Sequence, residues 1–309
     1  MPNQRAAELV LGSVQLGLAY GAANSTGKPS RAAALALVRH AVEQGVNTFD
    51  TARAYGDSED RLGEALATTR PVRTITKLSP LTDLPDSPSR HAVTAAVDAS
   101  IAQSRAALQR ATLDCVLLHR AAHMTAFDGA VWARLLDLRR DGAIKSLGVS
   151  LQSPEEALAV LASPDVAHIQ LAFNLLDWRW RDGGAIEAIR ARRDVTVHAR
   201  SIFLQGLLAS DDPKIWPRIA GVDPAALIAH IAQRARDLGR ESAADLCLAY
   251  VRGQDWIDGT VIGMETRSQL DANLRLAIKP PLSADICTLI EQMIPRVPAR
   301  LLDPAQWPR

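Results

Sequence analysis

Four side chains that can hold or move protons occur at the ends of three successive apolar runs, in the order Asp50, Tyr55, Lys77 and His119. Free tyrosine has a pKa of about 10, so it donates a proton poorly unless its phenolate is stabilised. A nearby lysine ammonium stabilises the phenolate, and a carboxylate beside that lysine keeps it charged and oriented. A neutral histidine can hydrogen-bond to a carbonyl oxygen and polarise it. This combination predicts a centre that protonates a carbonyl oxygen. The hydride must then come from a bound cofactor, because no side chain supplies one.

Each of these residues taken alone also has a structural interpretation. An aspartate that ends a strand often caps a helix, and a tyrosine after a strand is often an exposed turn residue. The lysine could be an ion-pair partner, and the histidine could be buried with its hydrogen bonds satisfied. The functional interpretation is favoured because all four lie at neighbouring strand ends, which a parallel barrel brings to one face.

Eight short β-rich runs must position these residues. Most are continuous apolar runs, which are typical of parallel strands buried on both faces. The predicted strands are Leu9–Gly12, Val46–Asp50, Val72–Lys77, Asp114–His119, Ser146–Ser150, His168–Gln170, Val195–Arg200 and Thr260–Ile262.

Helical patterns alternate with these strands. In the first, Arg31–Gln44, apolar residues form one stripe, Ser30 can cap the start and Gly45 can stop the helix. The others lie at about 58–68, 90–108, 127–140, 153–162, 183–192, 223–238 and 265–275, with two additional patterns near 243–253 and 283–296. The alternation predicts an α/β fold, a (β/α)8 TIM barrel that forms one domain over residues 1–309 with extra helices near the C-terminus. A doubly wound open sheet is the alternative, disfavoured because no GxGxxG motif is present.

Composition excludes several classes of partner. Lys plus Arg number 35 against 34 for Asp plus Glu, so no net basic charge favours nucleic acid or an anionic membrane. The three cysteines are scattered, without a CxxC pair, which predicts free thiols in a reducing cytoplasm and no metal site. The N-terminus lacks the apolar region of a signal peptide, and no apolar run reaches the ~20 residues that span a bilayer. Nothing marks an interface, so a monomer is expected.

The segment Gly45–Glu59, followed by Leu62-Gly63, resembles the signature of the aldo-keto reductases. The resemblance covers nearly the whole chain, through Lys77, Leu117–His119, Gly148–Ser150, Gln170, Asn174–Leu176, Ser201–Leu208 and Gly263–Asn273. It implies a (β/α)8 barrel with NAD(P)H across its mouth and a catalytic tetrad of Asp50, Tyr55, Lys77 and His119, with Tyr55 as the acid. Gln170 and the loop containing Gly206 are more similar to the potassium-channel β-subunit and aflatoxin-aldehyde reductase branch than to the aldose reductases.

The resemblance also implies a set of cofactor contacts, made by Ser150, Gln170, Arg200, Ser201, Leu204, Gly206, Gly263, Arg267, Gln269 and Asn273. Ser150 and Gln170 would hold the nicotinamide carboxamide, and amides near Gly206 would meet the pyrophosphate. Arg200 replaces the aromatic residue that usually stacks on nicotinamide, and it could stack likewise or pair with a carboxylate. Arg267 at a helix N-terminus favours a 2′-phosphate and hence NADPH. Glu265 opposes that preference, so NADH is the alternative.

The predicted activity is therefore the NAD(P)H-dependent reduction of an aldehyde or ketone, a small-molecule substrate that could be a sugar derivative. Tyr20, the loop Arg120–Phe127, Trp178, Trp180 and Phe203 could line its pocket. Within that loop, Arg120 and His123 suggest a polar or anionic substrate. The alternative is a nucleotide-binding regulatory subunit that senses redox state with little turnover. The intact set of four polar residues favours the enzyme.

Overall fold

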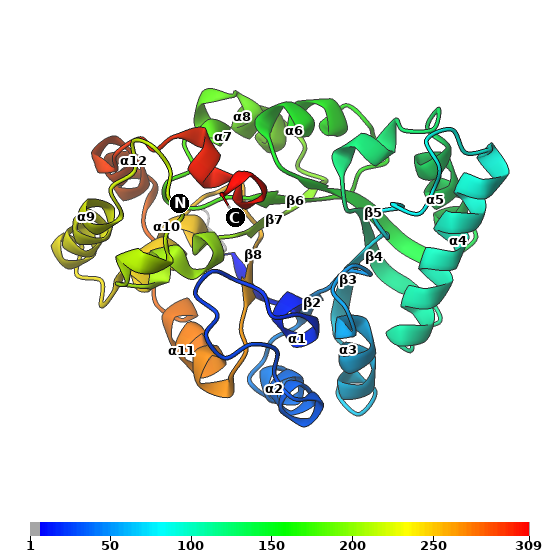
Figure 1. The fold of residues 1–309 in the computed structure, drawn as a ribbon, viewed down its shortest axis with the longest axis horizontal. Helices are drawn as coiled ribbons and strands as arrows, with labels where there is room; N and C mark the ends of the chain where they lie inside the picture. Colours follow the sequence, from blue (N-terminus) through cyan, green and yellow to red (C-terminus); the bar gives the residue numbers. More distant parts are fainter. Residues whose placement is uncertain (1–6, 309) are drawn as a thin grey trace.

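The computed structural model describes residues 7–308, in which eight parallel strands close into a barrel in sequence order. The strands are β1 (Glu8–Gly12), β2 (Thr48–Asp50), β3 (Arg73–Lys77), β4 (Leu113–Leu118), β5 (Ile144–Leu151), β6 (His168–Ala172), β7 (Thr196–Arg200) and β8 (Gly259–Gly263). Each strand begins and ends within two residues of the start and end of the corresponding predicted run. The closure of β8 onto β1 makes the fold a (β/α)8 barrel and excludes the open doubly wound sheet (Figure 1).

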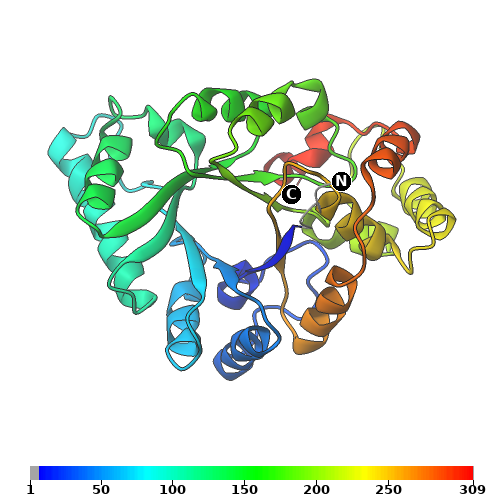
Figure 2. The same ribbon diagram turned by 180° about the vertical axis from the view of Figure 1, so that it is seen from behind.

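Helices surround this barrel, as the view from the opposite side also shows (Figure 2). They are α2 (Arg31–Glu43), α3 (Ser58–Leu66), α4 (Arg90–Ala107), α5 (Ala130–Arg140), α6 (Pro154–Leu161), α8 (Ala185–Ala191), α9 (Pro224–Asp237) and α11 (Arg267–Ala277). The capping signals work as the sequence indicates: the Ser30 side chain accepts a hydrogen bond from the Ala33 amide at the start of α2. The apolar core lies between the strands and these helices.

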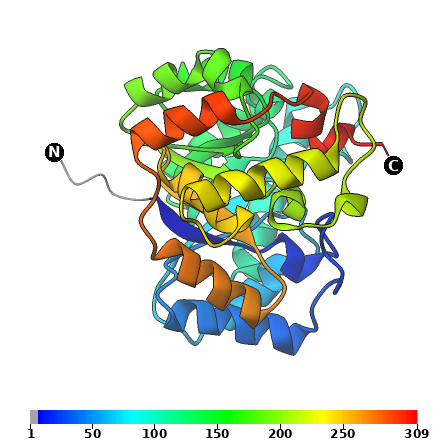
Figure 3. The ribbon, with the colours of Figure 1, turned by 90° about the vertical axis from the view of Figure 1, so that its left-hand side faces the viewer.

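The two additional helices are present as predicted, α10 (Ala243–Arg252) before β8 and α12 (Ala284–Met293) after α11. Several shorter elements were not predicted, namely α1 (Val14–Gly17), α7 (Arg179–Asp182), η1 (Ala121–Met124), η2 (Leu204–Ala209), η3 (Pro213–Ile215), η4 (Ala299–Leu302) and η5 (Pro304–Gln306). The segment after α12 (red) lies on the same side of the barrel as α1 and the loop that follows it (blue) (Figure 3). That side carries the C-terminal strand ends.

Three further findings concern residues 7–308. None of their helices is long and apolar enough to cross a membrane. No group of three or more histidine, cysteine, aspartate or glutamate side chains among them could hold a metal ion. The three cysteines are unpaired and buried.

Below the C-terminal face, the barrel contains a pair of buried histidines. The rings of His168 and His198 meet edge to face with centroids 4.4 Å apart, and both are almost completely buried. Both nitrogens of His168 and Nδ1 of His198 lack a hydrogen-bond partner within residues 7–308. Burial is the main cause that lowers the pKa of His198 to about 3, and the nearby Arg73 and Lys77 add to it. Burial also lowers the pKa of His168. Both rings are therefore neutral in the folded protein at neutral pH.

This pair predicts that stability is lost in mild acid. Below pH 6.5 the unfolded chain binds a proton at each histidine that the folded protein does not bind, so stability falls from pH 6.5 toward pH 3. At pH 5.5, His198 alone should cost about 1.4 kcal/mol. Urea unfolding at pH 7 and pH 5.5 measures this loss. His198→Asn should reduce the pH dependence, whereas His91→Asn, at an exposed position of α4, should leave it as it is. Equal pH dependence in all three proteins would contradict the assignment.

Candidate active site

Asp50 and Lys77 form a buried ion pair at the ends of neighbouring strands β2 and β3. Lys77 Nζ donates to Asp50 Oδ1 at 2.7 Å, to Asp50 Oδ2 at 2.8 Å and to the Thr51 carbonyl at 3.0 Å. The exposed fraction is 1% for Lys77 and 3% for Asp50. Burial alone would lower the pKa of Lys77, but Asp50 and Tyr55 together outweigh it and hold the pKa above its ordinary value. Lys77 is therefore a fixed positive charge.

Tyr55 and His119 complete the group that the sequence predicts to converge. Lys77 Nζ lies 5.1 Å from the centroid of the Tyr55 ring. The Tyr55 and His119 rings meet edge to face with centroids 5.9 Å apart. The loop that carries Tyr55 is held by α1, where a Cβ added at Gly17 would lie 1.8 Å from the Tyr55 carbonyl oxygen. Only glycine allows this approach, so helix α1, which the sequence did not predict, packs directly against the backbone of Tyr55.

His119 is a neutral side chain in a positively charged setting. Burial lowers its pKa to about 3, helped in order by Lys77, Arg200, Arg120 and His123. Its Nδ1 is buried and has no hydrogen-bond partner in the described part of the chain. A neutral imidazole at neutral pH can donate a hydrogen bond to a carbonyl oxygen without transferring its own proton. His119 therefore suits polarisation rather than general acid catalysis.

Gln170 makes a contact that the sequence analysis missed. Its Nε2 donates to Asp50 Oδ1 at 2.6 Å, while its Oε1 is buried without a partner among residues 7–308. Gln170 lies opposite Ser150 in the β5–β6 register, and both are buried. One end of the amide therefore orients the Asp50–Lys77 pair, and the other end remains available as an acceptor. The only signal for this contact in the sequence was that Gln170 and Asp50 both occupy positions that face the interior of a parallel barrel.

Arg200, at the end of β7, reaches over β6 to the end of β5. Its Nη2 donates to the Leu151 carbonyl at 3.2 Å and its Nη1 to Ser201 Oγ at 3.3 Å. Its guanidinium pairs with no carboxylate of the described residues, so the predicted alternative of an ion pair at the mouth is not observed. Burial and Tyr55 raise the pKa of Tyr20 while Arg200 opposes that rise, and Arg200 adds to the lowering of the pKa of His119 by burial and Lys77, so the guanidinium lies near both rings.

The segment after β7 forms a tight loop that includes three predicted contact residues, Ser201, Leu204 and Gly206. Ser201, Leu204 and Gln205 have φ values of 58°, 45° and 56°, in a region that costs energy for any residue but glycine. A Cβ added at Gly206 would lie 2.5 Å from Ala23 Cβ, and the Ala23 amide donates to the Gln205 carbonyl at 3.3 Å. The strained loop is thus packed against the segment that follows α1, a contact between distant parts of the chain that the sequence did not predict.

The remaining predicted contacts lie apart from the tetrad, on β8 and α11. Gln269 closes a capping box with Thr266, so its Oε1 accepts from the backbone amides of Glu265 and Thr266. Arg267 is 69% exposed, with its Nε 3.9 Å from Asp271 Oδ2. The Gln15 side chain occupies the space that a Cβ at Gly263 would need. Asn273 lies one turn after Gln269 on α11. The structural role of Gln269 is therefore to cap the N-terminal end of α11.

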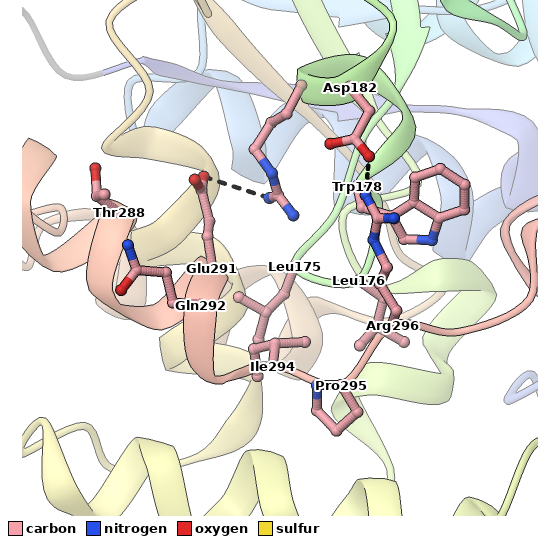
Figure 4. A pocket seen from close by; sticks show the side chains of 11 residues that line it. Leu175, Leu176, Trp178, Asp182, Thr288, Glu291, Gln292, Ile294, Pro295 and Arg296 are labelled. Carbon is pink, nitrogen blue, oxygen red and sulfur yellow. Dashed lines mark ion pairs between the residues drawn. The ribbon is translucent and has the colours of Figure 1, made fainter.

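A cavity of about 370 Å³ lies beside the barrel mouth, between α7 and α12 (Figure 4). Trp178, which was expected to line the substrate pocket, lines this cavity. The Arg296 guanidinium covers its ring at 4.4 Å and pairs with Asp182. Trp178 Nε1 also donates to the Val297 carbonyl at 3.0 Å. Trp180 is completely buried, so its expected place in the substrate pocket is wrong. α7 turns its side chain into the core.

Comparisons with known proteins extend these observations. The holo form of the aldo-keto reductase AKR11C1 from Bacillus halodurans superposes with a TM-score of 0.74 at 21% identity, covering 94% of this chain and 93% of that one. Its apo form gives 0.70 at 19% identity, covering 96% and 94%. A Pseudomonas aeruginosa protein assigned to the aldo-keto reductases gives 0.64 at 22% identity, covering 88% and 90%. At these identities the likeness shows the fold alone.

No curated protein sequence gives a significant match. The family model, however, matches residues 8–295, nearly the whole chain, and this span contains Asp50, Tyr55, Lys77 and His119. The chain belongs to the aldo/keto reductase family.

Proposed function

We propose that this protein is an NADPH-dependent reductase that converts an aldehyde or ketone to an alcohol, with Tyr55 as the proton donor. The observation that carries the proposal is the convergence of a fixed ammonium, a phenol ring and a neutral imidazole at one strand-end site. Membership of the family implies an oxidoreductase that reduces carbonyl compounds. To this we add Tyr55 as the proton donor, NADPH as the cofactor, and an aldehyde or ketone as the substrate.

The residues at the barrel mouth fit a nicotinamide cofactor. The buried Oε1 of Gln170 lacks a donor within residues 7–308, and a carboxamide N–H would supply one. Ser150 adds a hydroxyl beside it, and the loop from Ser201 to Gly206 offers backbone amides of the kind that hold phosphates. When bound, the cofactor would supply the hydride that no side chain can provide.

The chain's own residues divide the remaining work. The His119 imidazole, neutral at pH 7, donates a hydrogen bond to the substrate carbonyl and fixes its orientation. The Tyr55 hydroxyl transfers its proton to the carbonyl oxygen as negative charge develops there. Lys77 stabilises the resulting phenolate by charge. Asp50 keeps Lys77 charged, and Gln170 in turn holds Asp50 in place through the 2.6 Å hydrogen bond.

A redox-sensing subunit with little turnover remains the competing proposal. The placement in the potassium-channel β-subunit and aflatoxin-aldehyde reductase branch, which rests on Gln170 and the Gly206 loop, is a separate proposal about relationship. We favour the enzyme because the Asp50–Lys77 pair, the Tyr55 ring and the His119 ring lie together at one site. A screen of NADPH and NADH oxidation with sugars, aromatic aldehydes and ketones decides between the two. Nucleotide binding without turnover of any carbonyl would favour the sensor.

We expect a cytoplasmic monomer, and light scattering tests whether the protein is monomeric in solution.

Cofactor preference is expected to favour NADPH over NADH. The N-terminus of α11 and the exposed Arg267 favour a phosphate, whereas Glu265 repels it. Glu265→Ser should therefore shift the preference further toward NADPH, and Arg267→Gln should shift it toward NADH. Titration of both reduced cofactors measures the ratio of dissociation constants. Tighter NADH binding by the unaltered protein would overturn this expectation.

Arg200 should make the protein bind reduced cofactor more tightly than oxidised cofactor. A planar guanidinium stacks on a flat ring much as an aromatic side chain does, but its charge is unfavourable beside the cationic oxidised nicotinamide. The hydrogen bonds to Leu151 and Ser201 hold the guanidinium over the strand ends where Ser150 and Gln170 lie. Arg200→Tyr should narrow the difference between the two dissociation constants. An unchanged ratio would refute the stacking role.

A further inference from the structure

Helices α2 and α11 lie side by side on the outside of the barrel (Figure 1), and a side-chain contact joins them. His40 Nε2 of α2 lies 2.7 Å from Oδ1 of Asp271, in the second turn of α11. Because an ionised carboxylate can only accept hydrogen bonds, the ring nitrogen is the donor. The His40 side chain is 8% exposed and that of Asp271 is 52% exposed. A buried donor thus holds a carboxylate that stays open to solvent.

The same carboxylate lies beside Arg267, the first residue of α11. Asp271 Oδ2 is 3.9 Å from Arg267 Nε, a distance too long for a hydrogen bond but short enough for a charge interaction. Arg267 is 69% exposed and forms no other ion pair among residues 7–308. Asp271 is therefore bonded to His40 and lowers the positive potential around Arg267, while the guanidinium stays open to a ligand.

The other charged side chains of the two helices, and of the turn before α11, have different partners or none. Glu43 of α2 approaches the second nitrogen of the His40 ring, with its Oε2 3.7 Å from Nδ1. The others are Arg275, which pairs with Glu241, Arg31, which pairs with Glu64, and Arg39 and Glu265, which form no ion pair within residues 7–308. In this part of the chain, Asp271 is therefore the carboxylate that pairs with Arg267.

We propose that Asp271, positioned by His40, weakens the binding of the 2′-phosphate of NADPH at Arg267 and so sets the discrimination between NADPH and NADH. This inference rests on the proposed function, which places that phosphate at the start of α11, and names two residues that determine the specificity of the same site. A phosphate monoester carries about −1.5 to −2 charges at pH 7, so the Asp271 carboxylate repels it. NADH has a hydroxyl group in that position and is not repelled.

His40 limits this repulsion. Its hydrogen bond to Oδ1 holds the carboxylate toward α2, with Oδ2 3.9 Å from Arg267 Nε. An Asp271 side chain released from His40 can rotate onto Arg267 and form a direct ion pair, with an N–O distance of about 2.7–2.9 Å. A 2′-phosphate must then displace that pair before it binds. His40 is thus a positioning residue, because it acts through Asp271 and touches no ligand.

The first test is the titration of NADPH and NADH against Asp271→Asn. The ratio of NADPH affinity to NADH affinity should rise about threefold or more, through tighter NADPH binding alone. The control is Asp237→Asn on α9, where a similarly exposed aspartate pairs with Arg234 of the same helix at 3.0 Å. The control should keep the ratio of the unaltered protein. An unchanged or lowered ratio in Asp271→Asn would refute the inference.

The second test concerns His40. His40→Leu should lower the affinity ratio about twofold or more, and His40→Gln, whose amide can still donate to Asp271, should recover part of the loss. In the double variant His40→Leu, Asp271→Asn the ratio should equal that of Asp271→Asn, because His40 acts only through Asp271. A merely structural role would weaken NADPH and NADH alike. An equal effect of His40→Leu with and without Asp271 would refute the positioning role.

Two adenosine fragments separate this inference from the proposed function, because they carry no nicotinamide. In calorimetric titration, Asp271→Asn should bind 2′,5′-ADP about threefold or more tighter than the unaltered protein does, and AMP equally well. A gain for 2′,5′-ADP without turnover of any carbonyl would retain the role of Asp271 and refute the reductase. Turnover of a carbonyl with no change in 2′,5′-ADP affinity would refute the role of Asp271 and leave the reductase intact.

Discussion

Tyr55→Phe is expected to lower kcat by about 10²–10⁴, because the variant loses the group that protonates the carbonyl oxygen and nothing else. The phenylalanine ring keeps the edge-to-face contact with His119 and the position beside Lys77. Cofactor affinity should therefore change little. Steady-state kinetics at saturating NADPH, together with a titration of NADPH binding, measure the two effects separately.

A matched variant controls for the loss of a tyrosine hydroxyl. Tyr250 is buried in α10, where its hydroxyl donates to Glu291 at 2.6 Å and accepts from Arg181 at 3.0 Å, away from the tetrad. Tyr250→Phe is expected to cost stability but to keep kcat within a few-fold. If Tyr55→Phe retains near-normal kcat, the assignment of the acid is wrong.

The sequence predicts the barrel well because its signals are local. A run such as Thr74–Lys77 shows its strand character within four residues, and Ser30 and Gly45 mark the ends of α2 by their own chemistry. The placement of the tetrad follows from the same information, since strand ends of a parallel barrel share one face. No contact between distant residues is needed for either conclusion.

The contacts that could not be predicted join residues far apart in the chain. The hydrogen bond from Gln170 to Asp50 spans 120 positions, and the packing of Ala23 on Gly206 depends on the path of the loop after α1. Trp180 illustrates the same limit, because a short helix that sequence patterns do not reveal turns it into the core. Side-chain direction in loops is set by tertiary packing, which a local pattern does not contain.

These long-range contacts also determine how the stability and activity of the site respond when one of its residues is substituted. Asp50 accepts hydrogen bonds from Lys77 and from Gln170 on the same oxygen, so the removal of one donor leaves the other in place. A carboxylate with a single remaining neutral donor is still a buried charge without a counter-ion. The consequences for stability and for catalysis can therefore be separated by choosing which partner is altered.

Lys77→Met should be at least as damaging to turnover as the loss of the tyrosine hydroxyl, and it should also destabilise the fold. The variant removes the charge that stabilises the phenolate, and it leaves the 3%-exposed Asp50 with the Gln170 amide as its remaining side-chain donor. An orphaned buried carboxylate costs roughly 3–5 kcal/mol, which urea unfolding at pH 7 would detect.

The double variant Asp50→Asn, Lys77→Met distinguishes the two roles of Lys77. Asparagine carries no charge and can still accept the hydrogen bond from Gln170, so much of the lost stability should return. Turnover should not return, because the ammonium 5.1 Å from the Tyr55 ring centroid is still missing. Recovery of stability without recovery of kcat would locate the catalytic contribution in the charge of Lys77 itself. If Lys77→Met alone folds and turns over normally, that charge has no part in the reaction, and the phenolate must be stabilised by another group.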